Sequence, residues 1–190
     1  MTALMTTQLK EQDEHNLAQL AVSDIEAFAE LYRRHLTRVY RYHVAHVGNV
    51  RDAEDLTSQT FVAALEGIRS FRGTGSFAAW ILGIASRKRL MFYRGNKPEV
   101  PLEAALTYPS PDLPTDKAAA QRLQLESVSR ALRQITPERA EALILTYFGG
   151  LSHAEAGRVL NKSEAAVKML VSRGLQDLRE RTSLTLEVER

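Results

Sequence analysis

The residues with the clearest chemistry are basic and aromatic side chains that alternate between Gly67 and Lys97. This stretch holds seven Lys or Arg residues and no Asp or Glu. Cationic side chains neutralise backbone phosphates, and aromatic rings stack on unpaired bases. The pattern predicts a surface for single-stranded nucleic acid, although a simple core role is the alternative for Phe77 and Trp80. The set comprises Arg69, Phe71, Arg72, Phe77, Trp80, Arg87, Lys88, Arg89, Phe92, Tyr93, Arg94 and Lys97.

A second candidate site lies near the C-terminus, where two helical patterns are separated by a short turn at 160–162. Ser163 fits the N-cap of the second helix. If the apolar residues Val167, Leu170 and Val171 face inward, the outward side chains are Lys168, Met169, Ser172 and Arg173. A tight turn followed by a basic helix is typical of a helix-turn-helix that reads the DNA major groove. An ordinary helical hairpin with a solvated basic face is the alternative.

The charge reverses between these two sites. From Pro98 to Asp116 there are four Asp or Glu and no Lys or Arg, and five prolines fall between Gly95 and Asp116. Such a composition is typical of an extended linker. We therefore expect two domains, with a polar tail at 1–16, a helical domain at 17–95, an acidic linker at 96–117, a second helical domain at 118–182 and a tail at 183–190.

Composition excludes several classes of function. The chain has no cysteine, which rules out disulfides and Cys-ligated zinc, and no histidine spacing indicates a metal site. It has no apolar run of about 20 residues and no signal-peptide pattern, so we expect a cytoplasmic protein. Asp52, Glu54 and Asp55 begin a helix without a companion base, which favours a docking patch or helix-dipole role over catalysis. We expect that the protein is not an enzyme and that it binds no cofactor and no metal.

The elements that must position these residues are helices, because apolar residues recur at spacings of three and four. We expect an all-α fold of two small domains. Leu17 and Leu20 indicate a short first helix, and the helix through Ile68 should extend to a break at 72–75. The capping signals are Ser23 with Glu26, Ser76, Thr136 before Pro137, Ser152 with Glu155, and Ser163, and the stops are at Gly48–Asn49 and Gly149–Gly150.

The order of these segments resembles the bacterial sigma-70 family, specifically the small extracytoplasmic-function (group 4) type. The resemblance covers 17–181 and rests on several motifs in a fixed order. These are AFAELYRRH at 27–35, DAEDLTSQTF at 52–61, FRG at 71–73 followed by Phe77 and Trp80, YFGGLS at 147–152 and SEAAVK at 163–168. The chain departs from the usual pattern at Arg87, Met91, Lys162 and Leu170.

The resemblance implies a promoter-specificity subunit that initiates transcription with core RNA polymerase. It assigns docking on the beta-prime clamp helices to Asp52, Glu54, Asp55 and Gln59, and it also implies contact with the beta flap. It assigns melting of the minus-ten element to Arg69, Phe71, Arg72, Phe77, Trp80, Arg87, Lys88, Met91 and Arg94. It assigns reading of the minus-thirty-five element to Ser163, Lys168, Met169, Ser172 and Arg173.

The resemblance also implies that the acidic linker runs through polymerase toward the RNA path. It further implies that an anti-sigma protein binds and controls the chain, and that the chain itself does not insert into a membrane. Two alternatives from the residues stay open. The chain could be a stand-alone helix-turn-helix regulator whose first domain senses a ligand or dimerises, which predicts operator binding without polymerase. It could also be an RNA-binding protein or enzyme built on the basic block, which predicts salt-sensitive binding without sequence preference.

Overall fold

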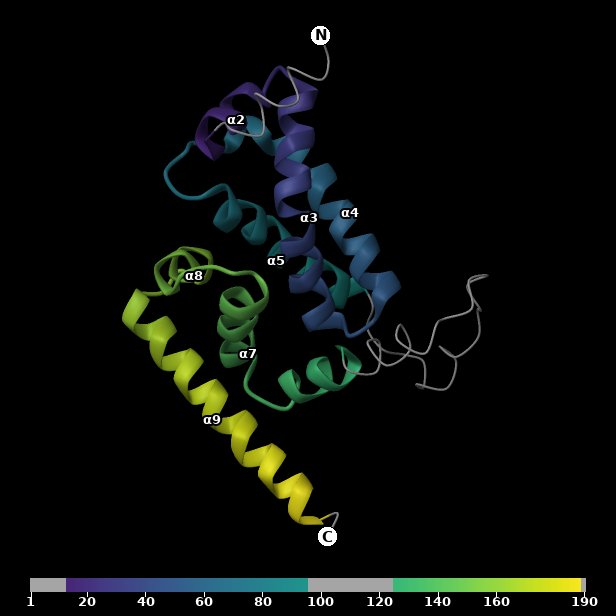
Figure 1. Cartoon of the computed structure of the whole chain (residues 1–190), viewed down its shortest axis with the longest axis vertical. Coiled ribbons are helices and arrows are strands. Elements are labelled where there is room, and N and C mark those ends of the chain that lie inside the picture. The colour runs from purple at the N-terminus through teal and green to yellow at the C-terminus, as the bar shows by residue number, and fades with distance from the viewer. Residues whose placement is uncertain (1–12, 96–124, 189–190) are drawn as a thin grey trace.

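The fold of the chain is seen in a computed structural model that describes residues 13–95 and 125–188, with backbone alone for 182–188. In these ranges the chain is helical and contains no strand, in agreement with the predicted all-α class (Figure 1). The elements are α2 (Glu14–Leu20), α3 (Ile25–Val47), α4 (Val50–Gly67), η1 (Ile68–Ser70), α5 (Phe77–Gly95), a helical segment at 125–132, α7 (Pro137–Leu143), η3 (Ile144–Phe148), α8 (His153–Leu160) and α9 (Glu164–Val188).

The first half of the fold is built on α3, against which α2, α4 and α5 pack. The N-cap of α3 is Asp24, whose carboxylate accepts a hydrogen bond from the Glu26 backbone at 2.9 Å. The predicted Ser23 capping box is therefore wrong by one residue, because Asp24 offers a stronger acceptor to the orphan amides. Gly48 ends α3 with φ of 67°, a conformation that glycine adopts without strain, and Asn49 caps α4.

The loop before α5 begins earlier than the sequence indicated. Helix α4 ends at Gly67 and continues for one 3₁₀ turn, η1, whereas the break was predicted at 72–75. Ser76 caps α5 as predicted, because its hydroxyl accepts from the backbone of Ala79 at 3.2 Å. The cap fixes the direction in which α5 leaves the loop.

The second half contains the helix-turn-helix, formed by α8 and α9. Ser152 and Glu155 form the predicted capping box of α8, and Ser163 caps α9 through the Ala166 backbone. Asn161 makes the turn at φ of 53°, a left-handed conformation that Asn tolerates. Helix α9 runs to Val188, so the predicted tail at 183–190 is helical over most of its length.

Two features of this half were not foreseen. Thr136 precedes Pro137 at the start of α7 as predicted, but its side chain makes no capping hydrogen bond. The segment before Gly149 is a π-helix, η3, whose Gly149 amide donates to the carbonyl of Ile144 at 2.8 Å. A Cβ on Gly149 would stand 2.8 Å from a methyl carbon of Leu82, so the bare backbone allows η3 to approach α5.

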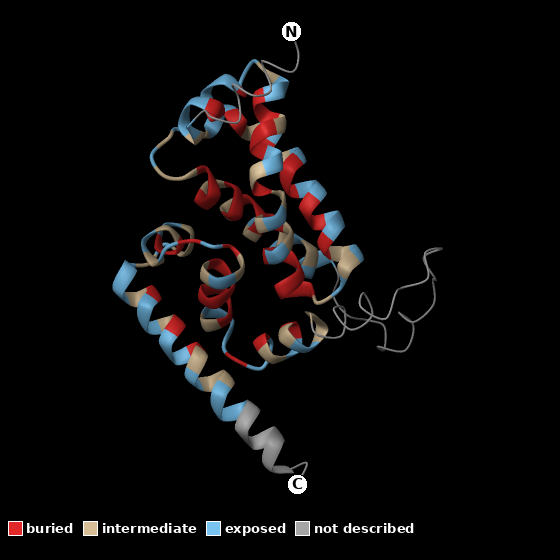
Figure 2. Ribbon diagram, viewed as in Figure 1, coloured by how far each residue is buried: buried red, intermediate tan, exposed pale blue. Residues whose placement is uncertain are grey.

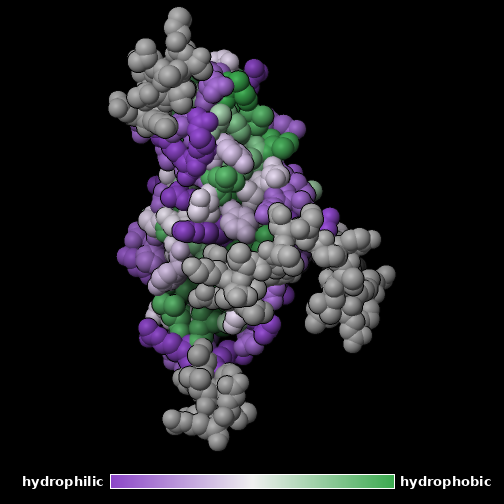
Figure 3. Space-filling view, turned by 45° about the vertical axis from the view of Figure 1, so that its right-hand side comes forward, coloured by the Kyte–Doolittle hydropathy of each residue, from purple (hydrophilic) through white to green (hydrophobic). Residues whose placement is uncertain are grey.

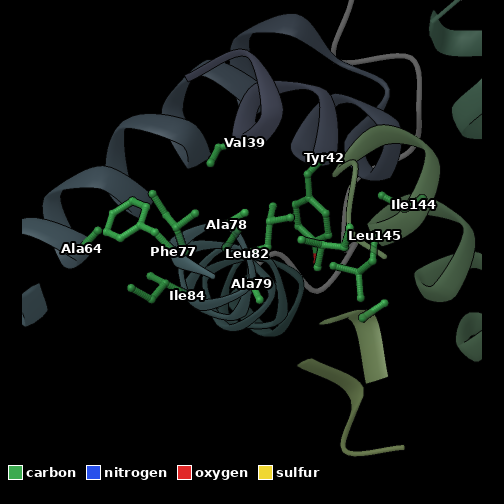
Figure 4. Close-up of a cluster of buried hydrophobic side chains, with 14 of the residues drawn as sticks. Val39, Tyr42, Ala64, Phe77, Ala78, Ala79, Leu82, Ile84, Ile144 and Leu145 are labelled. Atoms are coloured by element: carbon green, nitrogen blue, oxygen red, sulfur yellow. The ribbon is translucent and has the colours of Figure 1, made fainter. Parts of the chain in front are cut away.

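The two halves share one hydrophobic core. Helix α3 packs on η3, and α5 packs on α8. Ile144 and Leu145 of η3 lie with Tyr42 of α3 and Leu82 of α5 in one buried cluster (Figure 4). Buried residues line the facing sides of α5 and α7, whereas much of α9 is exposed (Figure 2). The two halves therefore form one body.

The predicted domain boundaries stay predictions, since most of the linker at 96–117 lies outside the described residues. The predicted polar tail at 1–16 overlaps the fold, because α2 begins at Glu14. Leu17 of this helix is fully buried against the core, as its apolar spacing indicated.

Candidate nucleic-acid interface

Three aromatic rings meet where the loop enters α5. The ring centroids of Phe71 and Trp80 are 5.5 Å apart, and Phe77 lies 5.6 Å from Phe71 and 5.2 Å from Trp80. Phe71 and Trp80 are partly exposed, but Phe77 is 1% exposed and belongs to the core. The prediction that Phe77 contacts DNA directly is therefore wrong. Its buried ring packs against the rings of Phe71 and Trp80 and helps to position them.

A pocket of about 630 Å³ opens beside this cluster. Its walls include the rings of Phe71 and Trp80 and the arginines Arg72 and Arg87, and no Asp or Glu is among its lining residues. Hydroxyl groups of Ser70, Thr74, Ser76 and Ser86 complete the polar side. Aromatic walls with cationic and hydroxyl groups suit a base and its phosphate. Arg158 and Val159 of α8 also line the pocket, so the second half of the chain borders it.

The outer face of α5 continues from this pocket. Arg87, Met91 and Arg94 recur at spacings of four and three, and all three are exposed. Lys88 is partly exposed beside them, and Arg69 and Arg72 are exposed at the loop. Together with Trp80 these residues form one cationic surface, which we call the α5 face. Its composition suits a phosphate backbone.

Arg89 does not belong to the α5 face. Its side chain is 16% exposed and turns inward, where Nη2 lies 2.8 Å from the Glu141 carboxylate of α7. The interpretation of Arg89 as a phosphate contact is therefore wrong. An isolated buried guanidinium is costly, and the carboxylate compensates its charge.

Glu141 is the centre of a polar cluster that sequence reasoning missed. Tyr42 donates its hydroxyl hydrogen to Oε1 of Glu141 at 2.6 Å, and Ser86 donates to the same oxygen at 3.4 Å. His46 Nε2 lies 3.2 Å from Oε2. The signal that the sequence offers is an acid inside an otherwise apolar run. The structure buries its neighbours Ala140, Ala142 and Leu143.

The environment of Glu141 keeps it ionised. Burial alone would raise the pKa of the carboxyl, but the contact with His46 and the charge of Arg89 outweigh it and hold the pKa at about 2. Burial lowers the pKa of His46 more than Glu141 raises it. The pKa of the Tyr42 hydroxyl is raised, chiefly by burial and then by the Glu141 charge.

The helix-turn-helix presents its own cationic surface. Val167 and Val171 are buried against the preceding helices, while Lys168, Met169, Ser172 and Arg173 are exposed. Lys168 pairs with Glu164 at 2.9 Å, and Met169 is 49% exposed. Ser163 is exposed and serves as the cap. We call Lys168, Met169, Ser172 and Arg173 the α9 face, which has the location of a recognition helix surface.

A close backbone approach sets the angle of this surface. A Cβ on Gly157 of α8 would stand 2.6 Å from the carbonyl oxygen of Lys162, so only glycine fits there. Lys162 in turn pairs with Glu138 of α7 at 3.1 Å. Arg139 and Asp177 pair at 2.5 Å and join α7 to α9. These contacts fix the helix-turn-helix on α7.

The predicted docking residues lie on α4. Glu54, Asp55 and Gln59 are exposed, and Asp52 is partly exposed. Beside them a groove of about 380 Å³ runs between α3 and α4, lined by Tyr32, Leu36, Thr37, Tyr40, Glu54, Thr57 and Ser58. Hydrophobic surface also gathers near the upper end of the molecule, where Figure 1 places the start of α3 (Figure 3). A groove of this kind beside the acidic side chains of α4 fits a protein partner more than DNA.

The histidines of the first half have structural roles. His43 is fully buried, and its Nε2 lies 2.9 Å from Thr60 Oγ1. His35 lies 3.0 Å from Glu14, which joins α3 to α2. Among the described residues no cluster of His, Cys, Asp or Glu could hold a metal ion, and no helix is long and apolar enough to cross a membrane.

Two family models match the chain in the order seen in the fold. Sigma-70 region 2 matches residues 31–99, and Sigma-70, region 4 matches residues 125–178. The first match contains the α5 face and the second contains the α9 face. The two matched segments leave out residues 100–124, which hold most of the acidic stretch.

Curated relatives agree with these models. The ECF RNA polymerase sigma factor BldN of Streptomyces coelicolor is 32% identical over 158 residues, which cover 82% of this chain and 60% of BldN. The RNA polymerase sigma factor YlaC of Bacillus subtilis is 27% identical over 87% of this chain and 97% of its own length. The chain thus spans about three fifths of BldN but nearly all of YlaC.

Solved structures show the same fold. CnrH, solved in complex with the cytosolic domain of CnrY, is 26% identical and matches with a TM-score of 0.67 over 94% of this chain and 99% of its own. The sigma factor RpoE of Bartonella quintana, 23% identical, matches in fold with a TM-score of 0.63 over 86% of this chain and 98% of its own. With both sigma regions in order and relatives matched over nearly their whole length, the chain belongs to the extracytoplasmic-function group of the sigma-70 family.

Proposed function

We propose that this chain is a promoter-specificity subunit that acts in the cytoplasm and initiates transcription only with core RNA polymerase. The observation that carries the proposal is the pair of cationic surfaces, the α5 face and the α9 face, each on a separate sigma region. A factor that opens one promoter element and reads another needs two such surfaces. Both regions are non-catalytic in this proposal, since the factor directs a reaction that polymerase performs.

The α5 face holds the melted non-template strand of the minus-ten element. Support comes from the pocket beside Phe71 and Trp80, which has aromatic walls and two arginines from the first half. A base that leaves the stack finds ring faces there, and Arg87, Lys88 and Arg94 neutralise the following phosphates. Met91 offers an apolar contact on the same face.

The α9 face reads the minus-thirty-five element as a duplex. Support comes from the exposure of Lys168, Met169, Ser172 and Arg173 on the second helix of a helix-turn-helix. Ser163 at the start of α9 places the helix N-terminus near a phosphate. Arg173 can bind guanine in the major groove, because a guanidinium matches its O6 and N7 acceptors.

The surface of α4 docks on the beta-prime clamp helices through Glu54, which lines the groove between α3 and α4, and through Asp52, Asp55 and Gln59 on the same helix. The second region contacts the beta flap, and the acidic linker follows the RNA path. A protein inhibitor of the anti-sigma type is a further partner. Support for such an inhibitor comes from CnrH, which was solved with the cytosolic domain of CnrY bound.

The test combines purified core polymerase with the chain and a library of promoter fragments. We expect specific transcripts that share two conserved elements, and no specific initiation without the chain. Asp55→Lys should abolish initiation by weakening binding to core polymerase, while Glu66→Lys, an equal charge change three turns along α4, should have little effect. Tight operator binding without polymerase, with no specific transcript, would instead support the stand-alone regulator.

A further inference from the structure

The strongest unexplained feature of the molecule is the Glu141 cluster, which joins the two sigma regions. We propose that Glu141 latches the free chain in a closed state, in which α8 forms one wall of the pocket of the α5 face and must move away before a DNA strand can lie along that face. The statement about the strand rests on the proposed function. The latch itself depends only on the contacts between the two halves.

The first step is the origin of the partners of Glu141. The carboxylate belongs to α7 of region 4, and its partners belong to α3 and α5 of region 2. Tyr42 and Ser86 donate to Oε1, while Arg89 and His46 lie 2.8 and 3.2 Å from Oε2. One side chain of region 4 thus lies within hydrogen-bond or ion-pair distance of four polar groups of region 2.

The second step is burial. Glu141 is 7% exposed and Arg89 is largely covered, so neither charge has much water around it. When the halves separate, both charges regain water. When the halves stay together without the carboxylate, Arg89 is left buried and uncompensated. The cluster therefore favours one specific docking of the two regions over other compact arrangements.

A second set of contacts holds the same arrangement at the end of α3. Arg133 donates to the carbonyl oxygen of Val47 at 2.5 Å, and Ser129 donates to that of His46 at 3.3 Å. These carbonyls are orphan acceptors of a helix C-terminus, where a cation is favourable. A Cβ on Gly48 would stand 2.8 Å from the Ser129 hydroxyl, so the bare backbone at Gly48 leaves room for the Ser129 side chain.

The third step is what the closed state covers. Glu155 of α8 accepts a hydrogen bond from Ser76, the cap of α5. Arg158 and Val159 line the pocket beside Trp80, and Arg158 Nη1 lies 3.1 Å from where a Cβ on Gly75 would stand. The α9 face remains exposed in the same arrangement. In the closed state α8 thus stands against one side of the strand-binding pocket, whereas the duplex-reading surface is open.

The chain provides its own probes for a test. Trp80 is the single tryptophan and lines the pocket that α8 borders, and the absence of cysteine allows two labels to be placed at chosen positions. The experiment measures acrylamide quenching of Trp80 in the full chain. It also measures energy transfer between dyes on Glu66→Cys and Gln176→Cys, which are exposed positions in the two regions.

We expect Glu141→Gln to raise the ratio of open to closed molecules by roughly 100-fold, because the variant leaves Arg89 uncompensated. Trp80 quenching should then increase at least about twofold, and energy transfer should fall. The control is Glu138→Gln on the same helix, whose partner Lys162 lies in the same region, and it should match the wild type in both measurements.

Unchanged quenching and unchanged energy transfer in a folded Glu141→Gln protein would overturn the latch. If that variant fails to fold, Arg133→Met tests the second set of contacts in the same two measurements, with the same outcomes. Neither measurement uses DNA or polymerase. An opened variant that supports no transcription with core enzyme would contradict the proposed function and leave the latch standing.

Discussion

The hydroxyl of Tyr42 lies 2.6 Å from the carboxylate of Glu141, although the two residues are 99 positions apart in the chain. The contact joins α3 of region 2 to α7 of region 4. Tyr42 is completely buried, so its hydroxyl has no alternative partner in water. A tyrosine in that position needs a buried acceptor, and Glu141 supplies it.

Removing the Glu141 carboxylate should destabilise the closed protein. We expect Glu141→Ala to lower the free energy of unfolding by about 3–5 kcal/mol, because Arg89 then stays buried without compensation. Urea unfolding measures the change. The double variant Arg89→Met/Glu141→Leu should recover most of the loss, since it removes both charges and keeps the volume. A double variant no more stable than Glu141→Ala would contradict this account.

Acid should destabilise the fold through His43 before the carboxylates titrate. Burial, with the charges of His46 and Arg89, lowers the pKa of His43 from 6.5 to about 3. The Thr60 hydroxyl donates its hydrogen to the Leu56 carbonyl, so toward His43 it acts as the acceptor of a hydrogen bond from Nε2–H of a neutral ring. Nδ1 of His43 has no hydrogen-bond partner, so a second proton placed there would be buried without an acceptor. The unfolded chain therefore binds the proton first as pH falls below 6.5.

This difference gives a measurable slope. Above pH 6.5 the ring is neutral in both states and has no effect on stability. Between pH 6.5 and 4.5 the free energy of unfolding should fall, with His43 contributing up to about 1.4 kcal/mol per pH unit and His46 adding in the same direction. His43→Gln keeps a donor for Thr60 and should flatten the profile. Equal slopes for the two proteins would count against the neutral ring.

The α9 face should affect promoter binding without affecting polymerase binding. Lys168→Ala with Arg173→Ala should weaken binding to the upstream element by about 1–3 kcal/mol for each lost base contact and reduce the salt dependence. Electrophoretic mobility shift at two salt concentrations measures both effects. Co-purification with core polymerase should be unchanged, and a parallel loss of both would refute the separation of roles.

Two glycines should respond oppositely to alanine. Gly157→Ala should destabilise the helix-turn-helix by about 1–3 kcal/mol, because the new Cβ would stand 2.6 Å from the Lys162 carbonyl. Gly83→Ala in α5 has no atom within 4 Å of its Cβ and should stabilise by up to about 1 kcal/mol. Thermal unfolding of both variants gives the comparison, and similar shifts would show that the close approach is unimportant.

The sequence predicted the parts of the fold that depend on local signals. Apolar spacing gave the helices, and the capping residues Ser76, Ser152 and Ser163 cap as expected. The register of Val167 and Val171 also predicted which side chains of α9 are exposed. The predicted cap at Ser23 is wrong because a local pattern cannot choose between two neighbouring acceptors, and Asp24 accepts a hydrogen bond from the same backbone amide.

The parts that could not be predicted depend on contacts between distant segments. Arg89 stands in a run of basic residues and differs from Arg87 only in the direction that α5 gives it. Phe77 has an aromatic side chain that could stack on a base, but it lies on the core side of the same helix. The Glu141 cluster brings together α3, α5 and α7, which no local pattern links.

Under the proposed function, the position of α8 at the wall of the pocket beside Trp80 has a consequence for the behaviour of the factor in a living cell. Replication and repair expose long tracts of unpaired DNA, which a freely accessible pocket with arginines and aromatic rings would bind regardless of sequence. Because Arg158 and Val159 form part of the pocket wall in the proposed closed state, we expect the latch to weaken the binding of such decoys to the unbound factor. We therefore expect the latch to keep the pool of factor available for polymerase and to confine strand capture to promoters.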